Sequence, residues 1–263
     1  AGQVCELCLS TTKEFNCIRK NCERSFFKSL GYALRNFFAR TFWGIYKDID
    51  RYIVQSDFQK SKFIKNGISE EKIFVVSGLT PTLNKVDINK NPKNVSFIGR
   101  VSIEKGILEF LSCAKELSDI PFVVVGEVSE EFEYLVRESP QNVEWKGFLS
   151  GEKLDNSFQD SKIIIVPSKW YEGFPNVITR AMKHSKPVIT SNIGAMSSII
   201  QHKKNGLLFQ SGNSKDLEKK IRFLYYNNSL CKIYGENGFV KVQNEYSSQN
   251  IYNSLYNVYK DLK

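Results

Sequence analysis

The sequence lacks any uninterrupted run of about 18 apolar residues, so no segment of it reads as a transmembrane helix. No export signal is visible at the start, and we therefore expect a cytoplasmic protein. The first residues are Ala-Gly-Gln rather than Met, which suggests that the true start of the protein is absent.

Histidine is also scarce, since His184 and His202 are the only two in the chain. Both lie among lysines, with no second ligand at helical spacing, so we expect solvated side chains rather than metal ligands. No Gly-x-Gly-x-x-Gly follows any predicted strand, and this absence disfavours an NAD-dependent oxidoreductase. Paired carboxylates of the glycosidase kind are missing as well, because Glu172 has no nearby acidic partner in the sequence.

Positive charge is plentiful: the 263 residues carry a formal net charge of +9, and 41% of them are hydrophobic. A basic balance suits nucleic acid, an anionic membrane or a phosphorylated substrate, and nucleic acid has only this charge in its favour. Residues 1–65 hold twelve Lys and Arg against six Asp and Glu, interleaved with aromatics from Phe26 to Tyr46. The predicted helix over 25–46 therefore either lies on anionic lipid at the inner face of a membrane or packs its aromatic side on the next domain.

Four of the six cysteines stand in the first 22 residues, as Cys5-x2-Cys8-x8-Cys17-x4-Cys22. In a reducing compartment, clustered thiolates favour a structural zinc site over disulfides, and unpaired thiols remain the third alternative. The other two cysteines lie in helical patterns and are expected to be core residues.

Strand and helix patterns alternate regularly after residue 92, with a linker predicted over 78–92 and a C-terminal helix over 241–263. This alternation predicts an α/β fold in which a Rossmann-like parallel sheet, over 93–240, is covered by helices on both faces. Ligands of such sheets bind at the carboxyl ends of the strands. The predicted strands are residues 94–98, 121–125, 143–145, 163–166, 187–190 and 206–209.

The most informative turn follows the fourth of these strands and reads Glu172-Gly-Phe-Pro-Asn176, before a helix over 177–183. It combines an acid, a glycine and a proline suited to a first helical turn, and a helix N-terminus there would face an anionic or hydroxyl-rich ligand. The segment resembles the Glu-x7-Glu element of family 4 retaining glycosyltransferases, which have the two-domain GT-B architecture and belong to the glycosyl transferases group 1.

A second turn, Gly99-Arg100-x4-Lys105-Gly106, resembles the Gly-Arg-x4-Lys-Gly element of the same family. The resemblance implies that Arg100 and Lys105 stabilise the departing diphosphate, as a guanidinium and an ammonium are suited to do. It also implies that Glu172 holds the donor sugar. Further donor-binding positions implied by the resemblance are Gly99, Gly126, Phe148, Ser168, Gly173, Phe174, Pro175, Asn176 and Val177. For Phe148, simple packing is an equal alternative.

The chain departs from the family at the second acid of the element, where Arg180 stands. A glutamate accepts from two ribose hydroxyls, whereas arginine only donates. We keep Arg180 as a donor-binding candidate, because hydroxyl oxygens accept hydrogen bonds. A degenerate site fits the substitution as well.

The resemblance assigns residues 93–240 to the nucleotide-sugar domain, the C-terminal half of a GT-B fold. Residues 1–77 resemble the end of the N-terminal acceptor domain, most of which is missing. The implied activity is metal-independent transfer of a hexosyl group from a nucleotide-diphosphate sugar to a glycan or lipid-linked acceptor in cell-surface polysaccharide synthesis. No cofactor is expected for catalysis. The alternative is a truncated or degenerate module that binds nucleotide sugars without catalysis.

Overall fold

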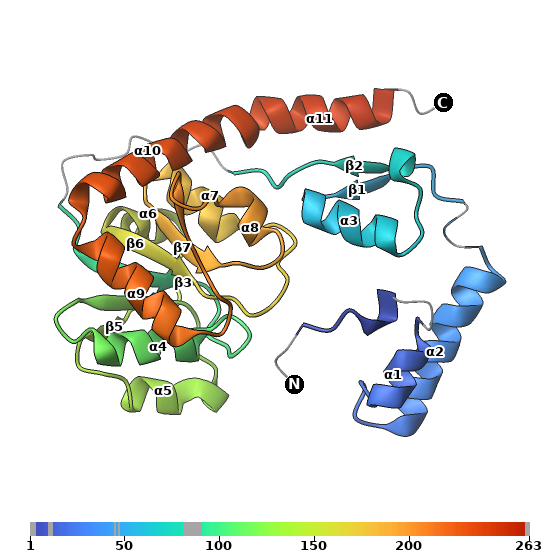
Figure 1. Ribbon diagram of the computed structural model, residues 1–263, viewed down its shortest axis with the longest axis horizontal. Coiled ribbons are helices and arrows are strands. Elements are labelled where there is room, and N and C mark those ends of the chain that lie inside the picture. Colours follow the sequence, from blue (N-terminus) through green and yellow to red (C-terminus); the bar gives the residue numbers. More distant parts are fainter. Residues whose placement is uncertain (1–3, 10–12, 45, 47, 81–90, 261–263) are drawn as a thin grey trace.

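The centre of the molecule is a parallel sheet of six strands, seen edge-on in the computed structural model (Figure 1). The strand order is β5-β4-β3-β6-β7-β8. The strands are β3 (Asn94–Ile98), β4 (Phe122–Val125), β5 (Val143–Trp145), β6 (Ser161–Val166), β7 (Val188–Ser191) and β8 (Gly206–Phe209). The structure describes residues 4–9, 13–44, 46, 48–80 and 91–260. Most of the predicted linker 78–92 lies outside these residues.

The central strand β6 shows why the sheet is covered on both faces. Its side chains alternate, so Ile163 and Ile165 enter one core while Ile164 and Val166 enter another. All four are buried, as the uninterrupted β-branched run requires. The α/β fold predicted from the sequence is therefore confirmed.

Amphipathic helices close both cores. The first core receives side chains from α4, α5 and α9, the second from α6, α7 and α8, and α10 contributes to both. Burial of these apolar stripes is what holds the short helices in place. Their bounds are α4 (Ile107–Glu116), α5 (Glu133–Arg137), α6 (Gly151–Gln159), α7 (Asn176–Lys183), α8 (Met196–Ile199), α9 (Ser214–Tyr225) and α10 (Asn228–Glu245).

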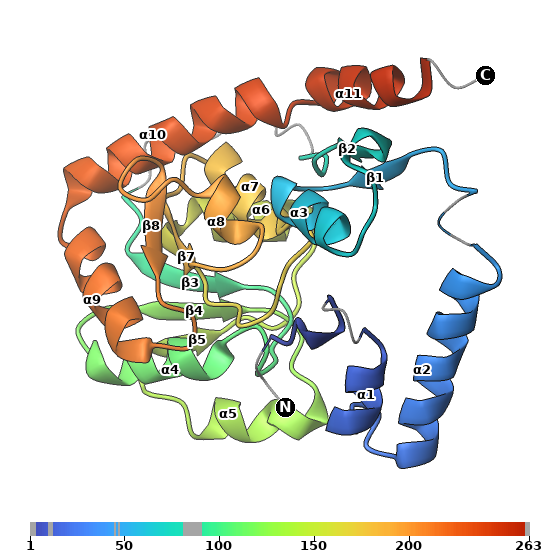
Figure 2. The ribbon, with the colours of Figure 1, turned by 45° about the vertical axis from the view of Figure 1, so that its right-hand side comes forward.

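A smaller unit precedes the sheet. Two parallel strands, β1 (Tyr52–Val54) and β2 (Ile73–Val75), pack against α3 (Asp57–Lys65). Before them, α1 (Phe15–Lys20) and α2 (Phe26–Thr41) form a helix pair that stands apart from the sheet in both views (Figures 1 and 2). Two short 3₁₀ turns, at Leu7–Leu9 and Glu70–Lys72, complete this part of the chain.

The C-terminal helix predicted over 241–263 is two helices in the structure. Helix α10 ends at Glu245, and α11 (Ser248–Lys260) follows after a break at Tyr246. Helix α11 runs beside β1 and β2 in both views (Figures 1 and 2), and the Arg51 guanidinium donates to the carbonyl of Val258. Helix α11 is thus attached to the small unit. Of the described helices, none combines the length and apolar character that crossing a bilayer requires.

Candidate functional site

The strand order creates a switch point between β3 and β6. From β3 the chain moves outward to β4 and β5, then returns to β6 on the other side of β3. The loops that follow β3 and β6 therefore leave the sheet side by side, at the place where ligands of such sheets bind. Both motifs singled out in the sequence lie in these two loops.

The two loops are in close backbone contact. Gly106, at the end of the first loop, has a φ of 80°, and a Cβ there would lie 2.0 Å from the carbonyl oxygen of Pro167. The backbone N–H of Lys169 donates to the carbonyl of Glu104 over 2.8 Å. Only glycine fits such an approach, so the glycine of the first motif sets the distance between the loops.

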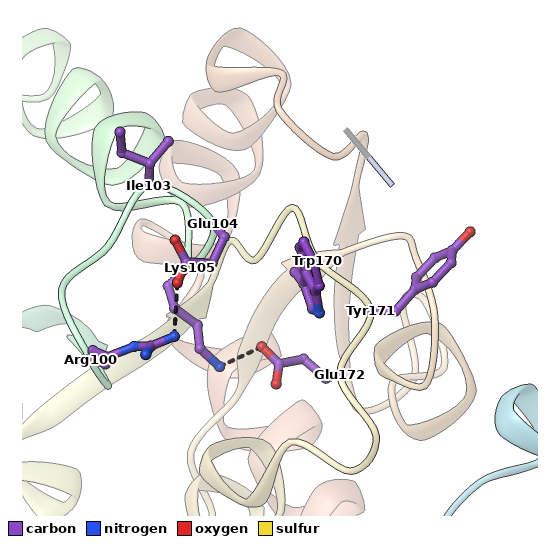
Figure 3. A pocket seen from close by; sticks show the side chains of 7 residues that line it. All are labelled: Arg100, Ile103, Glu104, Lys105, Trp170, Tyr171 and Glu172. Atoms are coloured by element: carbon purple, nitrogen blue, oxygen red, sulfur yellow. Dashed lines mark hydrogen bonds and ion pairs between the residues drawn. The ribbon is translucent and has the colours of Figure 1, made fainter. Parts of the chain in front are cut away.

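A cavity of about 640 Å³ opens between them. It is lined by Arg100, Ile103, Glu104, Lys105, Trp170, Tyr171 and Glu172 (Figure 3). The three residues predicted to be catalytic thus come together around one space. Their roles stay predictions.

An ion pair crosses this cavity. The Lys105 ammonium lies 2.6 Å from the Glu172 carboxylate (Figure 3). The buried Ser168 hydroxyl donates to the same carboxylate oxygen over 3.0 Å. With Glu172 only 17% exposed, the pair is largely withdrawn from solvent. Ser168 therefore contacts Glu172 without lining the cavity itself.

Arg100 stands at the open side of the same cavity. Its guanidinium lies 2.8 Å from the Glu104 carboxylate and is 69% exposed. The pKa of Glu104 is lowered, first by its own backbone N–H and further by the charges of Arg100 and Lys105, which together outweigh the effect of burial. Because an exposed ion pair is weak, Arg100 is free to exchange Glu104 for an anionic ligand.

A second cavity, of about 280 Å³, adjoins the first and shares Lys105 and Glu172 with it. It is lined at the sheet edge by Gly99 and at the start of α7 by Phe174, Pro175, Asn176 and Val177. These are predicted donor-binding residues, and the backbone N–H groups of the first turn of α7 favour negative charge nearby.

A third cavity, of about 250 Å³, is lined by two more of the predicted donor positions and shares Gly99 with the second cavity. Its lining includes Gly126, Phe148, Leu149 and Leu154. A Cβ at Gly126 would lie 1.9 Å from the Gly99 carbonyl oxygen, so glycine is required there too. Phe148 is 72% exposed, which is unfavourable for an aromatic ring without a partner and suits stacking on a planar ligand.

Three predicted donor positions lie outside the linings of these three cavities, and one of them is Ser168, which contacts Glu172. Gly173 lies against the Gln59 side chain of α3. Arg180 turns to α6, where its Nε and Nη2 donate to Asp155 Oδ1 over 3.0 and 2.8 Å. Burial alone would raise the pKa of Asp155, but hydrogen bonds from Arg180 and His184 outweigh it and lower the pKa.

His184 corrects the expectation of a solvated histidine. It is buried, stacks on Phe158 with ring centroids 5.4 Å apart, and lies 3.2 Å from Asp155. Burial lowers the pKa of His184 despite the neighbouring carboxylate. No periodic pattern in the sequence marked this cluster, because it forms only where α6 packs beside α7. His202 is exposed, and its Nδ1 accepts from the Leu208 backbone N–H over 2.9 Å.

The four N-terminal cysteines are free thiols, and Cys17 alone among them is buried. Burial and then the nearby Cys22 and Cys5 raise the pKa of Cys8. Within the described part of the chain, no group of three or more His, Cys, Asp or Glu side chains has the arrangement that holds a metal ion. The predicted zinc stays a prediction. Cys113 and Cys231 are core residues as expected.

The aromatic side chains of α2 are covered only in part by the described residues, since Phe37 contacts Phe15 of α1 with ring centroids 6.1 Å apart. Phe27 is 81% exposed, while only Ser29 and Ala33 of this helix are buried. Within the described part of the chain, most of these aromatic side chains therefore stay exposed.

Residues 81–241 match the family model of the glycosyl transferases group 1. An uncharacterized glycosyltransferase of Methanocaldococcus jannaschii is 30% identical over 186 residues, which are 68% of this chain and 52% of that protein. The capsular polysaccharide biosynthesis glycosyltransferase CapM of Staphylococcus aureus is 28% identical, over 63% of this chain and 45% of CapM. The chain thus spans about half the length of the curated relatives it matches.

Among solved structures, Anabaena HepE in complex with UDP superimposes with a TM-score of 0.72 at 20% sequence identity. The match covers 81% of this chain and 64% of HepE. Such neighbours identify the fold as that of GT-B glycosyltransferases.

Proposed function

The chain belongs to the glycosyl transferases group 1 family, and we propose that it takes part in retaining transfer of a hexosyl group from a nucleotide-diphosphate sugar. The acceptor in this proposal is a glycan or a lipid-linked glycan of the cell surface. The relatives support this choice, since one is named for capsular polysaccharide biosynthesis and another is a poly(ribitol-phosphate) N-acetylglucosaminyltransferase.

One observation carries the proposal: Lys105 and Glu172 face a single cavity at the switch point of the sheet and lie 2.6 Å apart. An ammonium and a carboxylate in one cavity suit the two ends of a sugar diphosphate. The cation suits the phosphate and the acid suits the sugar hydroxyls. When the donor binds, each side chain exchanges its present partner for a ligand group.

The proposed reaction then needs charge stabilisation more than a proton relay. The acceptor hydroxyl oxygen bonds to the anomeric carbon, the bond from that carbon to the diphosphate oxygen breaks, and its electron pair leaves with the diphosphate. The hydroxyl proton is taken up by the departing phosphate oxygen. Lys105, Arg100 and the N-terminus of α7 would stabilise the negative charge that develops, so no metal or cofactor is invoked.

The two smaller cavities extend the proposal to the rest of the donor. The cavity at the start of α7 would hold the diphosphate and the sugar. The nucleobase would enter the cavity of Gly126 and Leu154 and stack on Phe148, whose ring is otherwise exposed. Gly99, which lines both of these cavities, would then lie beside the ribose.

A non-catalytic nucleotide-sugar-binding module is the second candidate, and the Arg180 contacts favour it. With its guanidinium engaged by Asp155, this position offers no acceptor to a ribose hydroxyl. Loss of a bidentate acceptor weakens binding by about 1–3 kcal/mol. If the arginine at this position marks a degenerate site, Arg180→Glu should strengthen donor binding. If the arginine is an adaptation to a different donor, Arg180→Glu should weaken it.

Calorimetry with a panel of UDP- and GDP-sugars, followed by an assay of transfer or hydrolysis, tests both candidates. Binding with turnover is expected of the enzyme, and binding without turnover of the module. A chain that binds no nucleotide sugar at millimolar concentration would contradict both.

For the small unit, we propose peripheral contact with an anionic membrane through α2. Exposed aromatic side chains beside basic residues suit the boundary between lipid headgroups and acyl chains. Such contact would bring a lipid-linked acceptor to the protein. A structural zinc held by Cys5, Cys8, Cys17 and Cys22 is a further proposal, supported by their spacing.

A further inference from the structure

A carboxylate from the N-terminal segment reaches the loop that carries Glu172. Glu6 Oε1 accepts from the Tyr171 hydroxyl over 2.7 Å and also from the Lys62 ammonium of α3. Lys65, one turn further along α3, approaches the other oxygen of Glu6 at 3.3 Å. One acid therefore joins three parts of the chain that are far apart in sequence.

Tyr171 is held at its ring as well as at its hydroxyl. The ring meets Phe58 of α3 edge to face, with centroids 4.5 Å apart, and the Lys62 ammonium lies 5.5 Å from the Tyr171 centroid. On another side the ring approaches Gly194, where a Cβ would come within 3.1 Å of it. These contacts leave Tyr171 little rotational freedom.

Tyr171 and Glu172 point in different directions from adjacent positions. In Figure 3 the Glu172 carboxylate points to Lys105, whereas the Tyr171 ring points away from that pair. Both residues line the large cavity. Because they share a peptide bond, whatever fixes Tyr171 also fixes the backbone from which Glu172 reaches the cavity.

We propose that Glu6 is a positioning residue for the donor site, acting through Tyr171 to hold Glu172 in place against Lys105. Its role does not require contact with the donor. The inference rests on the proposed function in one respect, since its effect on donor binding presupposes that a nucleotide sugar binds here.

The charges in this cluster keep the contact intact at neutral pH. Hydrogen bonds from Lys62 and then Tyr171 lower the pKa of Glu6 to about 2, and the Glu6 carboxylate raises the pKa of Tyr171 to about 12. Glu6 is thus an acceptor and Tyr171 a donor over the working range. Because the pKa of Glu6 is lower in the folded chain than the 4.5 of the unfolded chain, its carboxylate stabilises the fold fully above about pH 4.5. This contribution is lost as the pH falls toward 2.

The test compares Glu6→Gln and Tyr171→Phe with Glu70→Gln as the matched control. Glu70 pairs with Lys60 of the same helix α3 at 3.0 Å, but it has 70% of its side chain exposed and takes no part in the Tyr171 contact. Both test variants should weaken binding of the preferred nucleotide sugar about three- to tenfold, which corresponds to the net contribution of one ordinary hydrogen bond. The double variant should bind the nucleotide sugar about as tightly as the single variant with the lower affinity, because Glu6→Gln and Tyr171→Phe remove the same contact. Glu6→Asp should recover part of the affinity.

A second readout does not need the donor. Trypsin cleaves after Lys169, two residues before Tyr171, so release of the loop should speed cleavage there in Glu6→Gln and Tyr171→Phe and not in Glu70→Gln. Absorbance titration should show the Tyr171 phenol ionising nearer its ordinary pKa in Glu6→Gln.

The outcomes separate the two claims. If the wild type binds no nucleotide sugar while Glu6→Gln still speeds cleavage after Lys169, the proposed function fails and the positioning role stands. If cleavage and donor affinity match the Glu70→Gln control, the positioning role is overturned whether or not the donor binds.

Discussion

Gly106→Ala is the substitution that most directly perturbs how the site is assembled. Gly106 has a φ of 80°, and a methyl group there would lie 2.0 Å from the Pro167 carbonyl oxygen. Gly147 offers a matched control, because its φ is 63° and nothing lies within 4 Å of a Cβ at that position. Both variants suffer the left-handed backbone, but only Gly106→Ala meets a steric obstacle.

The magnitudes follow from these two terms. A non-glycine residue in the left-handed region costs about 1–2 kcal/mol, and that cost applies to both variants. Overlap with a backbone carbonyl that cannot rotate away adds about 1–3 kcal/mol for Gly106→Ala alone. Because relief of the overlap moves the loop of Lys105 away from the loop of Glu172, donor affinity should fall together with stability.

Urea unfolding of both variants measures the difference, and calorimetry with a nucleotide sugar measures the loss of affinity. We expect Gly106→Ala to unfold at a clearly lower urea concentration than Gly147→Ala and to bind donor more weakly than the wild type. Equal stability of the two variants would refute the close contact of the loops.

Three further outcomes are expected. Burial lowers the pKa of His184 below 6.5, so the unfolded chain binds more protons than the folded chain as the pH falls through 6.5. The free energy of unfolding should therefore decline below about pH 6.5. His184→Gln should flatten this decline in urea titrations between about pH 5 and pH 8. The double variant Phe27→Ser with Trp43→Ser should lose sedimentation with anionic vesicles while the wild type retains it in low salt, and equal sedimentation would contradict membrane contact by α2. Metal analysis of reduced protein should find about one zinc per chain, lost in Cys8→Ser, and a metal-free wild type would contradict the zinc proposal.

The sheet could be predicted from the sequence because parallel strands buried on both faces have a simple signature. The run Ile163–Val166 has no polar residue, and in the structure its side chains alternate between two hydrophobic cores. The meeting of Lys105 with Glu172 was also predictable, because both motifs follow strands and the carboxyl ends of parallel strands share one edge.

Other contacts could not be predicted because they depend on tertiary packing. The pattern of His184 and its neighbouring lysines resembles a solvated helix face, and only the position of α6 beside α7 buries the ring against Phe158. The contact between Glu6 and Tyr171 spans most of the chain and involves no periodic pattern. The break of the C-terminal helix at Tyr246 likewise follows from tertiary packing, since that side chain is buried against Phe174.

The proposed function depends above all on Lys105 binding the diphosphate and Glu172 binding the sugar. Calorimetry with UDP and with a UDP-sugar on one variant of each residue separates these two roles. We expect Lys105→Met to weaken binding of both ligands, about tenfold or more, because both carry the diphosphate. Glu172→Gln should weaken binding of the UDP-sugar while leaving binding of UDP nearly unchanged. Equal loss for both ligands in Glu172→Gln, or undiminished UDP binding in Lys105→Met, would contradict these roles.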